Sequence, residues 1–329
     1  MGRNCHISAI RALAFIGAEP VFVYPDEKGG IPVEEARSRM TESGAKVLYV
    51  TSPDYYGRLC DISALAEVCH SLGASLLVDN AHGAHLGLFG LHPLSLGADA
   101  VAESAHKTLP ALTPGAMLHL RESERKKAAR EALNLFTSTS PSYLVLASLD
   151  YCAGELLAGG LDYTKAAEHF ALLREKAGAM ALAAGDPCKL TLRPGEWGYP
   201  GPSAAALFRK EGVEPEMVTE THLVLMATAF NQEEDYRRLD RALSQMQRRP
   251  PLEEREPAWR PPPRGATVRR AVFGKKESIS TRRAAGRIAA AVSTPCPPGI
   301  PVVVPGEILT ENICGLLIKS GILEVEVLL

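Results

Sequence analysis

Ser104-Ala105-His106-Lys107-Thr108-Leu109-Pro110 places one lysine directly after a short run of residues that favours a strand. A second unusual stretch, Val78-Asp79-Asn80-Ala81-His82-Gly83-Ala84-His85, lies upstream, and its aspartate precedes the lysine by 28 residues. Ligands of open α/β sheets bind beyond the carboxyl ends of the strands. An aspartate that ends one strand and a lysine just past a later strand therefore predict a ligand site at that edge of the sheet.

The two residue types indicate a particular chemistry. A lysine amine can form a Schiff base with the aldehyde of pyridoxal 5′-phosphate, as Lys107 would here. A carboxylate such as Asp79 can keep the pyridine nitrogen protonated, so that the ring accepts electrons from a substrate carbanion. The pair predicts a pyridoxal phosphate enzyme. On other readings Lys107 is a surface lysine and Asp79 a helix cap.

The flanking sequence alternates strand and helix patterns, which is typical of a mostly parallel sheet with helices on both faces. Residues 62–69 have helical spacing, with Asp61 as N-cap and Gly73 past the end. The expected strands are Val21–Val23, Lys46–Thr51, Ser75–Val78, Ala100–Ala102 and Ala116–Leu120. We therefore expect an α/β fold in which a βαβ unit ends just before Asp79.

The remainder of the chain predicts a smaller α+β region and a tether. The expected elements are helices at Tyr143–Leu157, Tyr163–Ala184, Ala204–Lys210, Glu233–Gln247 and Ser280–Ala291, and strands at Lys189–Leu192, Leu223–Ala227 and the Val-rich stretch 302–304. The helices from 143 to 184 should pack on the sheet and offer a dimer face. The expected domains are a major domain at 1–150, a helical connection with a small α+β domain at 151–247, a Pro/Arg-rich linker at 248–271 and a C-terminal domain at 272–329.

Composition excludes several classes of protein. A net charge of −2, from 36 basic and 38 acidic residues, gives no reason to expect nucleic acid or an anionic membrane as partner. Seven scattered cysteines without a C-x-x-C pair predict neither a disulfide framework nor a zinc site. No apolar run reaches the ~20 residues of a membrane helix, and no signal peptide is evident at the N-terminus. These features predict a cytoplasmic protein.

Six stretches in the same order resemble the bacterial ornithine/lysine/arginine decarboxylases. They are RNCHISAI at 3–10, TSPDYYG at 51–57, VDNAHGAH at 78–85, SAHKTLPALT at 104–113, TSTSPSYLVLASLD at 137–150 and PPGIPVVVPGE at 297–307. The resemblance implies a fold-type-I pyridoxal phosphate enzyme that decarboxylates lysine, arginine or ornithine to the corresponding amine. The expected partner is therefore a small molecule, the amino acid substrate.

The resemblance also implies roles for single residues. Lys107 matches the Schiff-base lysine and Asp79 the partner of the pyridine nitrogen. His6 matches the histidine that stacks on the coenzyme ring, with Ala81 on the other face. Two residues match positions that contact the coenzyme phosphate, namely Ser104 and His106.

Further roles concern the partner subunit and the histidines after Asp79. Ser138 and Thr139, with Ser140, resemble a stretch that reaches the phosphate of the neighbouring subunit, which implies a homodimer; alternatively they cap the helix after Pro141. His82 is expected near the coenzyme or orienting Asp79. His85 is expected to be structural. No third ligand pairs with these histidines in the sequence, so no metal site is expected.

The departures from the family pattern leave alternatives open. Family members have a further N-terminal part with a phosphate-binding loop, whereas this chain starts five residues before His6 and is expected to lack it. The usual glutamate after the coenzyme-binding aspartate is Asn80. Glu307 is a candidate for the distal group of the substrate. The alternatives are a catalytically impaired or non-catalytic homologue, and other chemistry of the same coenzyme such as transamination.

Overall fold

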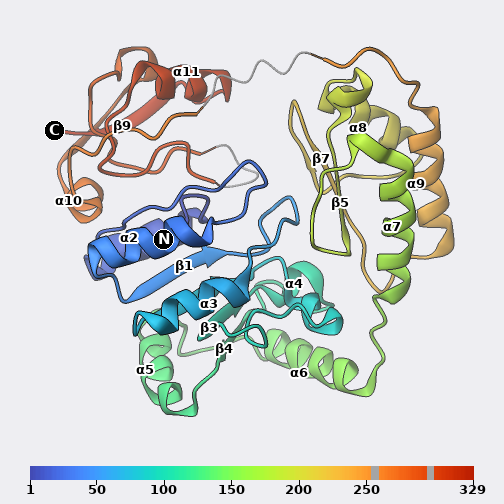
Figure 1. Ribbon diagram of the computed structural model, residues 1–329, viewed down its shortest axis with the longest axis horizontal. Helices are drawn as coiled ribbons and strands as arrows, with labels where there is room; N and C mark the ends of the chain where they lie inside the picture. The colour runs from blue at the N-terminus through green and yellow to red at the C-terminus, as the bar shows by residue number, and fades with distance from the viewer. Residues whose placement is uncertain (253–258, 295–299) are drawn as a thin grey trace. The chain divides into compact units, whose positions relative to one another are not determined.

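The protein is described by a computed structural model that covers residues 1–252, 259–294 and 300–329. Its packing divides the chain into two compact units (Figure 1). The first unit joins Met1–Pro25 to Arg255–Leu329, and the second comprises Asp26–Glu254. This division links the first residues of the chain to its last part, a link that the sequence did not predict. The four domain ranges expected from the sequence remain predictions.

A four-stranded sheet organises the second unit. Its strands are β1 (Val47–Thr51), β2 (Ser75–Asp79), β3 (Ala100–Glu103) and β4 (Met117–Leu120), in the order β1-β2-β3-β4. The first three strands are parallel, and β4 pairs antiparallel with β3. Asp79 lies at the end of β2, in register with Thr51 and Ala102. The predicted parallel sheet is confirmed, and it places Asp79 at the carboxyl edge.

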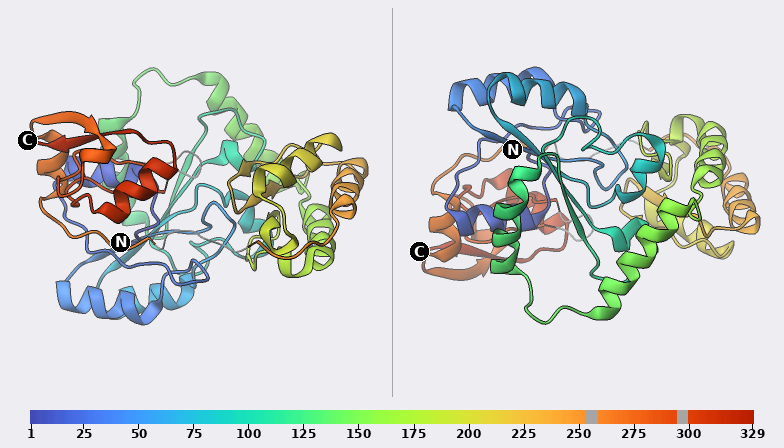
Figure 2. Two further views of the ribbon diagram at one scale, coloured as in Figure 1. Left: turned by 90° about the horizontal axis from the view of Figure 1, so that it is seen from above. Right: turned by 90° about the horizontal axis from the view of Figure 1, so that it is seen from below.

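Helices lie on both faces of this sheet (Figure 2). One side carries α2 (Val33–Ser43) and α3 (Ile62–Ser71), and the other side carries α5 (Lys126–Phe136) and α6 (Tyr143–Ala158). The side chain of Asp61 accepts a hydrogen bond of 3.0 Å from the Ala64 amide, which confirms the predicted N-cap of α3. Leu65 and Val68 are buried on this helix, whereas α6 buries only Cys152.

A second, antiparallel sheet completes the same unit. Its strands are β5 (Lys189–Leu192), β7 (Leu223–Met226) and the two-residue β6 (Met217–Val218), in the order β5-β7-β6. The helices α7 (Thr164–Ala177), α8 (Gly201–Lys210) and α9 (Glu233–Gln245) pack around it. Buried side chains such as Phe170, Phe208 and Leu239 form one core with β5 and β7. The predicted small α+β region is confirmed.

The first unit has its own small core. It contains α1 (Ile7–Ile16), α10 (Val268–Phe273), α11 (Glu311–Lys319) and the antiparallel pair β8 (Lys276–Ser280) and β9 (Glu324–Leu328). Val303, Leu309 and Val327 are fully buried in this core. A buried ion pair joins the start of the chain to its last part, with Arg3 Nη2 2.9 Å from Glu307 Oε2.

Several predicted elements are wrong. Val21–Val23 is no strand, because only Val23 pairs, in an isolated bridge with Gly2. The helix predicted to reach Ala184 ends at Ala177, where Gly178 has a φ of 54° that lies outside the helical region.

The C-terminal part departs further from the prediction. The helix predicted at 280–291 is instead the end of β8, a single 3₁₀ turn at Thr281–Arg283 and irregular chain. The Val-rich stretch forms only a bridge between Val303 and Ser293, since it has no neighbouring strand to extend a ladder. The predicted linker contains the start of α10 at Val268, and its residues 253–258 lie outside the described residues, as do 297–299 of the PPGIP motif.

Candidate functional site

The carboxylate of Asp79 is held in place from two sides. Tyr49, on the neighbouring strand β1, donates its hydroxyl to Asp79 Oδ2 at 3.0 Å. The backbone amide of Ala81 donates to Asp79 Oδ1 at 3.1 Å. Each oxygen therefore has one fixed donor and keeps a second lone pair that another N–H group can reach. Asp79 is thus oriented at the edge of the sheet where ligands bind in α/β proteins.

Lys107 lies just past the next strand, in the single helical turn α4 (Ala105–Thr108). Its Nζ is 3.2 Å from Nε2 of His82, which follows Asp79 by three residues. The His82 imidazole is 8% exposed and packs against the ring of Tyr55, with 4.7 Å between the ring centroids. Lys107 itself is exposed at the surface. The structure therefore brings together Lys107 and His82, two of the residues predicted from the sequence.

Two buried hydroxyl groups, one in register with Asp79 and one next to Lys107 in the sequence, fit a polar ligand. The buried hydroxyl oxygens of Thr51 and Thr108 have no hydrogen-bond partner among the described residues. Buried polar groups are rarely left without partners, so such atoms indicate a place that a ligand or water completes. Together with an amine, an oriented carboxylate and an imidazole, these residues fit pyridoxal phosphate.

The two predicted phosphate contacts differ in their surroundings. His106 Nδ1 lies 2.8 Å from the carbonyl oxygen of Gly115, so Nδ1 carries the proton and donates it. Nε2 could then donate to a phosphate only in the charged imidazolium form. Ser104 is the N-cap residue of α4, and its hydroxyl makes no capping hydrogen bond.

Comparisons with known proteins identify the family of the chain. Residues 1–170 match the family model described as Orn/Lys/Arg decarboxylase, major domain, and residues 245–317 match the model of the C-terminal domain. The chain belongs to the Orn/Lys/Arg decarboxylase family. It is 32% identical over 351 residues to the arginine decarboxylase of Bacillus subtilis, a match that covers 97% of this chain and 72% of that protein. It is 31% identical to the arginine decarboxylase of Halalkalibacterium halodurans, over 94% of this chain and 70% of that protein.

Solved structures support the fold of this family member. The constitutive lysine decarboxylase of Escherichia coli superposes with a TM-score of 0.77 at 20% identity, over 100% of this chain and 66% of that chain. A NifS-like protein of Rickettsia africae superposes with a TM-score of 0.58 at 12% identity, over 74% of each chain. The chain thus spans about two thirds of the length of the lysine decarboxylase. The predicted family and fold class are confirmed.

Other residues predicted from the family motifs lie in different surroundings. His6, in the first compact unit, is the N-cap of α1, and its Nδ1 accepts from the Ser8 amide at 3.3 Å. Its stacking on the coenzyme ring stays a prediction, as does the role of Ala81 on the other face. Ser138 and Thr139 are exposed before α6, but the N-cap of that helix is Ser142. The capping alternative for Ser138 to Ser140 is therefore wrong, because the helix begins two residues later.

Glu307 does not fit the role that the sequence suggested for it. Its carboxylate is 1% exposed and accepts from Arg3 Nη2 at 2.9 Å, from Arg3 Nε at 3.3 Å and from the Val304 amide at 2.8 Å. These donors already occupy both oxygens, which argues against a contact with the distal group of a substrate. The motif alone could not reveal this, because Arg3 lies 304 residues away.

The sequence did not predict a second polar cluster, which is centred on the last residue of β3. Glu103, at the end of β3, accepts from His92 Nε2 at 2.8 Å, from His119 Nε2 at 3.0 Å and from the side-chain amide of Asn80. Although burial opposes it, the hydrogen bonds of His119 and His92 lower the pKa of Glu103 to about 2. The same carboxylate raises the pKa of His119. Asn80, where the family pattern has glutamate, thus donates to a buried carboxylate on the neighbouring strand.

The three ligand atoms of His92, Glu103 and His119 lie within 4.8 Å of one another, as metal ligands do. However, His92 Nδ1 accepts from the Leu94 amide at 3.1 Å. The proton of the neutral His92 ring must then be on Nε2, where it is donated to Glu103. A metal-bound histidine normally donates its other ring N–H, so this arrangement favours a hydrogen-bonded cluster. The prediction that the protein has no metal site stays a prediction.

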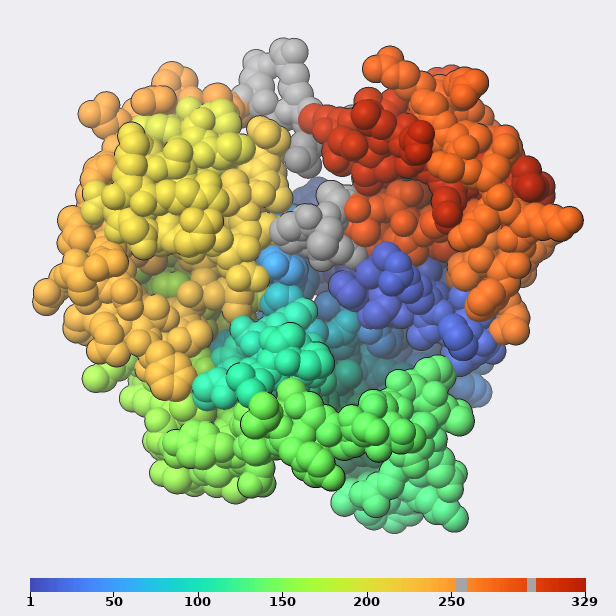
Figure 3. All heavy atoms as spheres, turned by 180° about the vertical axis from the view of Figure 1, so that it is seen from behind, coloured from blue at the N-terminus to red at the C-terminus, as the bar shows by residue number. Residues whose placement is uncertain are grey.

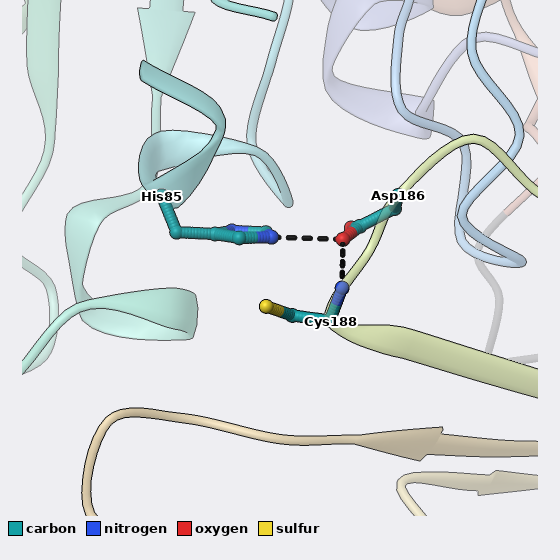
Figure 4. A group of neighbouring side chains, drawn as sticks. All are labelled: His85, Asp186 and Cys188. Carbon is teal, nitrogen blue, oxygen red and sulfur yellow. Dashed lines mark hydrogen bonds and ion pairs between the residues drawn. The ribbon is translucent and has the colours of Figure 1, made fainter. Parts of the chain in front are cut away.

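His85 has partners that its sequence neighbours do not reveal (Figure 4). It lies in the 3₁₀ turn η1 (Ala84–Phe89), and its Nε2 is 2.8 Å from Asp186 Oδ1. The same oxygen accepts from the Cys188 amide at 2.9 Å. His85 thus does have neighbouring groups that could act as ligands, which corrects the sequence argument. All three side chains are buried, and burial raises the pKa of the Cys188 thiol to about 12, which favours a structural bridge.

The described part of the chain contains no helix with the length and apolar character needed to span a membrane.

The sequence also gave no indication that one lysine, Lys189, is buried. It is 1% exposed at the start of β5, and burial lowers its pKa. Its Nζ lies 3.5 Å from the carbonyl oxygens of Asp54 and Tyr55. No signal in the sequence marks a lysine as buried when its partners are backbone carbonyls of a distant loop.

Proposed function

We propose that this chain catalyses the pyridoxal phosphate-dependent decarboxylation of a basic amino acid. The observation that carries the proposal is the pair formed by Lys107 and His82, 3.2 Å apart, next to the strand that ends in Asp79. When bound, pyridoxal phosphate supplies an aldehyde that an amine can attack and a protonated ring that accepts electrons from the substrate. The remaining work of holding groups and protons belongs to the residues of the chain.

Asp79 would hold the proton on the ring nitrogen of the coenzyme. Its carboxylate can do so only in one orientation, and Tyr49 and the Ala81 amide fix that orientation through one hydrogen bond to each oxygen. A pre-oriented carboxylate needs no reorganisation during the reaction, which is the main source of electrostatic catalysis in enzymes.

His82 would accept the proton of the lysine amine. An ammonium group cannot attack an aldehyde, so Lys107 must lose a proton before it bonds to the coenzyme. The Nε2 atom of His82 lies within hydrogen-bonding distance of Nζ and can accept that proton. A positioned base of this kind contributes roughly 100-fold to 10,000-fold to a rate.

The substrate is proposed to be arginine, lysine or ornithine. Support comes from family membership and from relatives that are named arginine decarboxylase and lysine decarboxylase. The product would be the corresponding amine, with loss of carbon dioxide. Agmatine, cadaverine or putrescine would identify which of the three is used.

We also propose that the chain forms a homodimer through α6. This helix has a predominantly apolar sequence yet leaves several large side chains at the surface: Tyr143 is 82% exposed, Leu144 74% and Leu157 91%. The segment that contains α5 and α6 lies on the surface of the molecule (Figure 3). A helix that is apolar on its outer face generally has a partner. Ser138 and Thr139 precede this helix, which would bring them to the interface and to the neighbouring phosphate.

The dimer proposal makes a direct prediction. Leu144→Glu puts a charge on the exposed face of α6 and should convert the dimer to monomer in sedimentation velocity experiments. Leu172→Glu is the matched control, because Leu172 on α7 is 65% exposed and lies outside the proposed interface. A wild-type chain that sediments as a monomer at micromolar concentration would refute the proposal.

The test of the function begins with coenzyme attachment. Purified protein is mixed with pyridoxal phosphate, reduced with borohydride and digested, and the modified lysine is located by mass spectrometry. We expect a pyridoxyl group on Lys107 and none in Lys107→Arg, which keeps the charge. Lys127→Arg, on the exposed helix α5, is the matched control and should leave attachment to Lys107 unchanged.

Product analysis then distinguishes the alternatives. Release of carbon dioxide from arginine, lysine or ornithine, abolished in Lys107→Arg and strongly reduced in Asp79→Asn, supports the proposal. Attachment without carbon dioxide release would favour another reaction of the coenzyme, such as transamination. If the coenzyme does not attach to Lys107, the proposal fails and the non-catalytic homologue becomes the better description.

A further inference from the structure

Tyr55 lies between the proposed reactive amine and the small sheet. On one side its ring packs against His82, at 4.7 Å between centroids and an angle of 59°. His82 in turn lies 3.2 Å from Lys107 Nζ. The histidine is almost fully buried, so its ring orientation is fixed by what packs against it.

On the other side, Tyr55 is tied to residues of the small α+β region. Its hydroxyl donates to Glu216 Oε1 at 2.9 Å, directly before β6. The ammonium of Lys189, at the start of β5, lies 5.8 Å from the centre of the Tyr55 ring and 3.5 Å from its carbonyl oxygen. A cation over an aromatic face and a hydrogen bond at the far end of the same ring leave Tyr55 little freedom.

We propose that Tyr55 is a positioning residue for the lysine amine: anchored by Glu216 and Lys189, it holds the His82 imidazole at the orientation that points Nε2 towards Lys107. This inference rests on the proposed function for its catalytic meaning. It adds that the small region influences the reactive amine indirectly, through Tyr55 and His82. The geometry of the His82–Lys107 contact thus depends, through Tyr55, on Lys189 and Glu216, which lie more than 130 positions after Tyr55 in the chain.

The ring of Tyr55, rather than its hydroxyl, does most of the positioning. Tyr55→Leu removes the flat surface against His82, and the imidazole can then rotate away from Lys107. Tyr55→Phe keeps that surface and loses only the hydrogen bond to Glu216. The leucine variant should therefore free the His82 ring to rotate, while the phenylalanine variant should largely keep the wild-type orientation of His82.

The adjacent residue offers a matched control. Tyr56 packs against a different histidine, His222, at 4.9 Å between centroids and an angle of 52°. Tyr56→Leu removes the same ring from the same loop, but it leaves the contact between Tyr55 and His82 in place. Any effect common to both leucine variants reports damage to the loop, and any effect specific to Tyr55→Leu reports the positioning of His82.

The first measurement needs no coenzyme. Diethyl pyrocarbonate acylates accessible imidazole nitrogens, and peptide mass spectrometry gives the rate at each histidine. We expect Tyr55→Leu and Lys107→Met each to raise the rate at His82 by roughly fivefold, the factor that corresponds to one lost hydrogen bond. Tyr55→Phe should stay near the wild-type rate, and Tyr56→Leu should raise the rate at His222 instead. An unchanged rate at His82 in Tyr55→Leu would overturn the proposal.

The second measurement connects positioning to the reaction. Stopped-flow absorbance gives the rate at which pyridoxal phosphate attaches to Lys107. His82→Gln and Tyr55→Leu should each slow attachment by roughly tenfold or more, and the double variant should be no slower than His82→Gln alone. Additive losses would show that Tyr55 does not act through His82. If the coenzyme does not attach even to the wild type, the proposed function fails, while the acylation rates still decide the role of Tyr55.

Discussion

The buried ion pair between Arg3 and Glu307 gives a prediction whose size follows from the structure. The two side chains are 3% and 1% exposed, and Arg3 also donates to the Pro301 carbonyl at 2.8 Å. In Arg3→Met, a side chain of similar length replaces the cation, and Glu307 stays buried with the Val304 amide as its one remaining donor among the described residues. Burial already raises the pKa of Glu307 against the opposing effect of Arg3, so removal of the cation should raise it much further.

In Arg3→Met, the free energy of unfolding decreases because folding then requires Glu307 to bind a proton. Between its unfolded pKa of 4.5 and the raised folded pKa, the folded variant binds one proton more than the unfolded chain. The free energy of unfolding therefore falls as the pH rises, by about 1.4 kcal/mol per unit. Because the pKa of Glu307 is already raised in the wild type, only its additional rise counts as a loss, and at about pH 7 we expect a loss in the ~3–5 kcal/mol range of buried pairs that lose one partner.

The assay uses urea unfolding followed by fluorescence in a Trp197→Phe background. Trp259, which donates to the Val302 carbonyl and packs against Arg3, then reports on the unit that contains the pair. Adding Glu307→Gln to Arg3→Met should restore at least about half of the loss and remove its pH dependence, because the amide oxygen still accepts from Val304.

The matched control for this prediction is a pair of the same kind at the surface. Arg264 and Glu19 lie in the same compact unit and are 31% and 40% exposed. Arg264→Met should cost no more than about 1 kcal/mol, as exposed pairs generally do. A loss in Arg3→Met as small as this, with the same value at about pH 5 and about pH 7, would refute the reasoning that Glu307 is left as a buried unpaired charge.

Two further predictions concern the second unit. Burial, with help from Arg58 and Arg193, lowers the pKa of His222 to about 4, so between about pH 6.5 and pH 4 only the unfolded chain binds the proton. The free energy of unfolding should fall by roughly 3 kcal/mol as the pH drops through this range, and urea unfolding of His222→Gln should lack that slope. Asp186→Ala should cost about 2–4 kcal/mol, because it leaves the His85 ring and a buried amide without their acceptor. Asp186→Asn should recover part of this in the same assay, and equal losses in the two variants would contradict it.

The parts of the fold that could be predicted from the sequence depend on local patterns. The strands β1 to β4 and the helix α3 are regular elements whose apolar periodicity and caps lie within a few residues, as Asp61 illustrates. The positions of Asp79 and Lys107 followed from the ends of such strands. The failures occur where long-range contacts decide, as in residues 280–291, which contribute to β8 and to bridges with distant strands instead of a helix.

In the candidate site, too, residues in local motifs could be predicted from the sequence, whereas residues defined by long-range contacts could not. Lys107 and His82 lie in motifs, so both could be singled out before any contact was known. The sequence placed His82 near the coenzyme or Asp79, however, and did not predict its contact with Lys107. Tyr49, Tyr55 and Lys189 could not be assigned, because their importance comes from what they touch across the fold. A tyrosine in a strand or loop has the same local sequence signal whether it faces solvent or holds a catalytic group in place.

Asn80 shows why a departure from a family motif need not mean a lost function. Read alone, the change from glutamate to asparagine removes a carboxylate beside Asp79. In the structure, Asn80 donates its amide to Glu103, whose two oxygens are also bonded by His92 and His119. A glutamate at position 80 would face the charge of Glu103 at that place, and like charges in contact strongly disfavour ionisation of one partner. An asparagine at position 80 is therefore compatible with an ionised Glu103. The chain keeps a buried negative charge at the end of β3, on the strand next to the one that ends in Asp79.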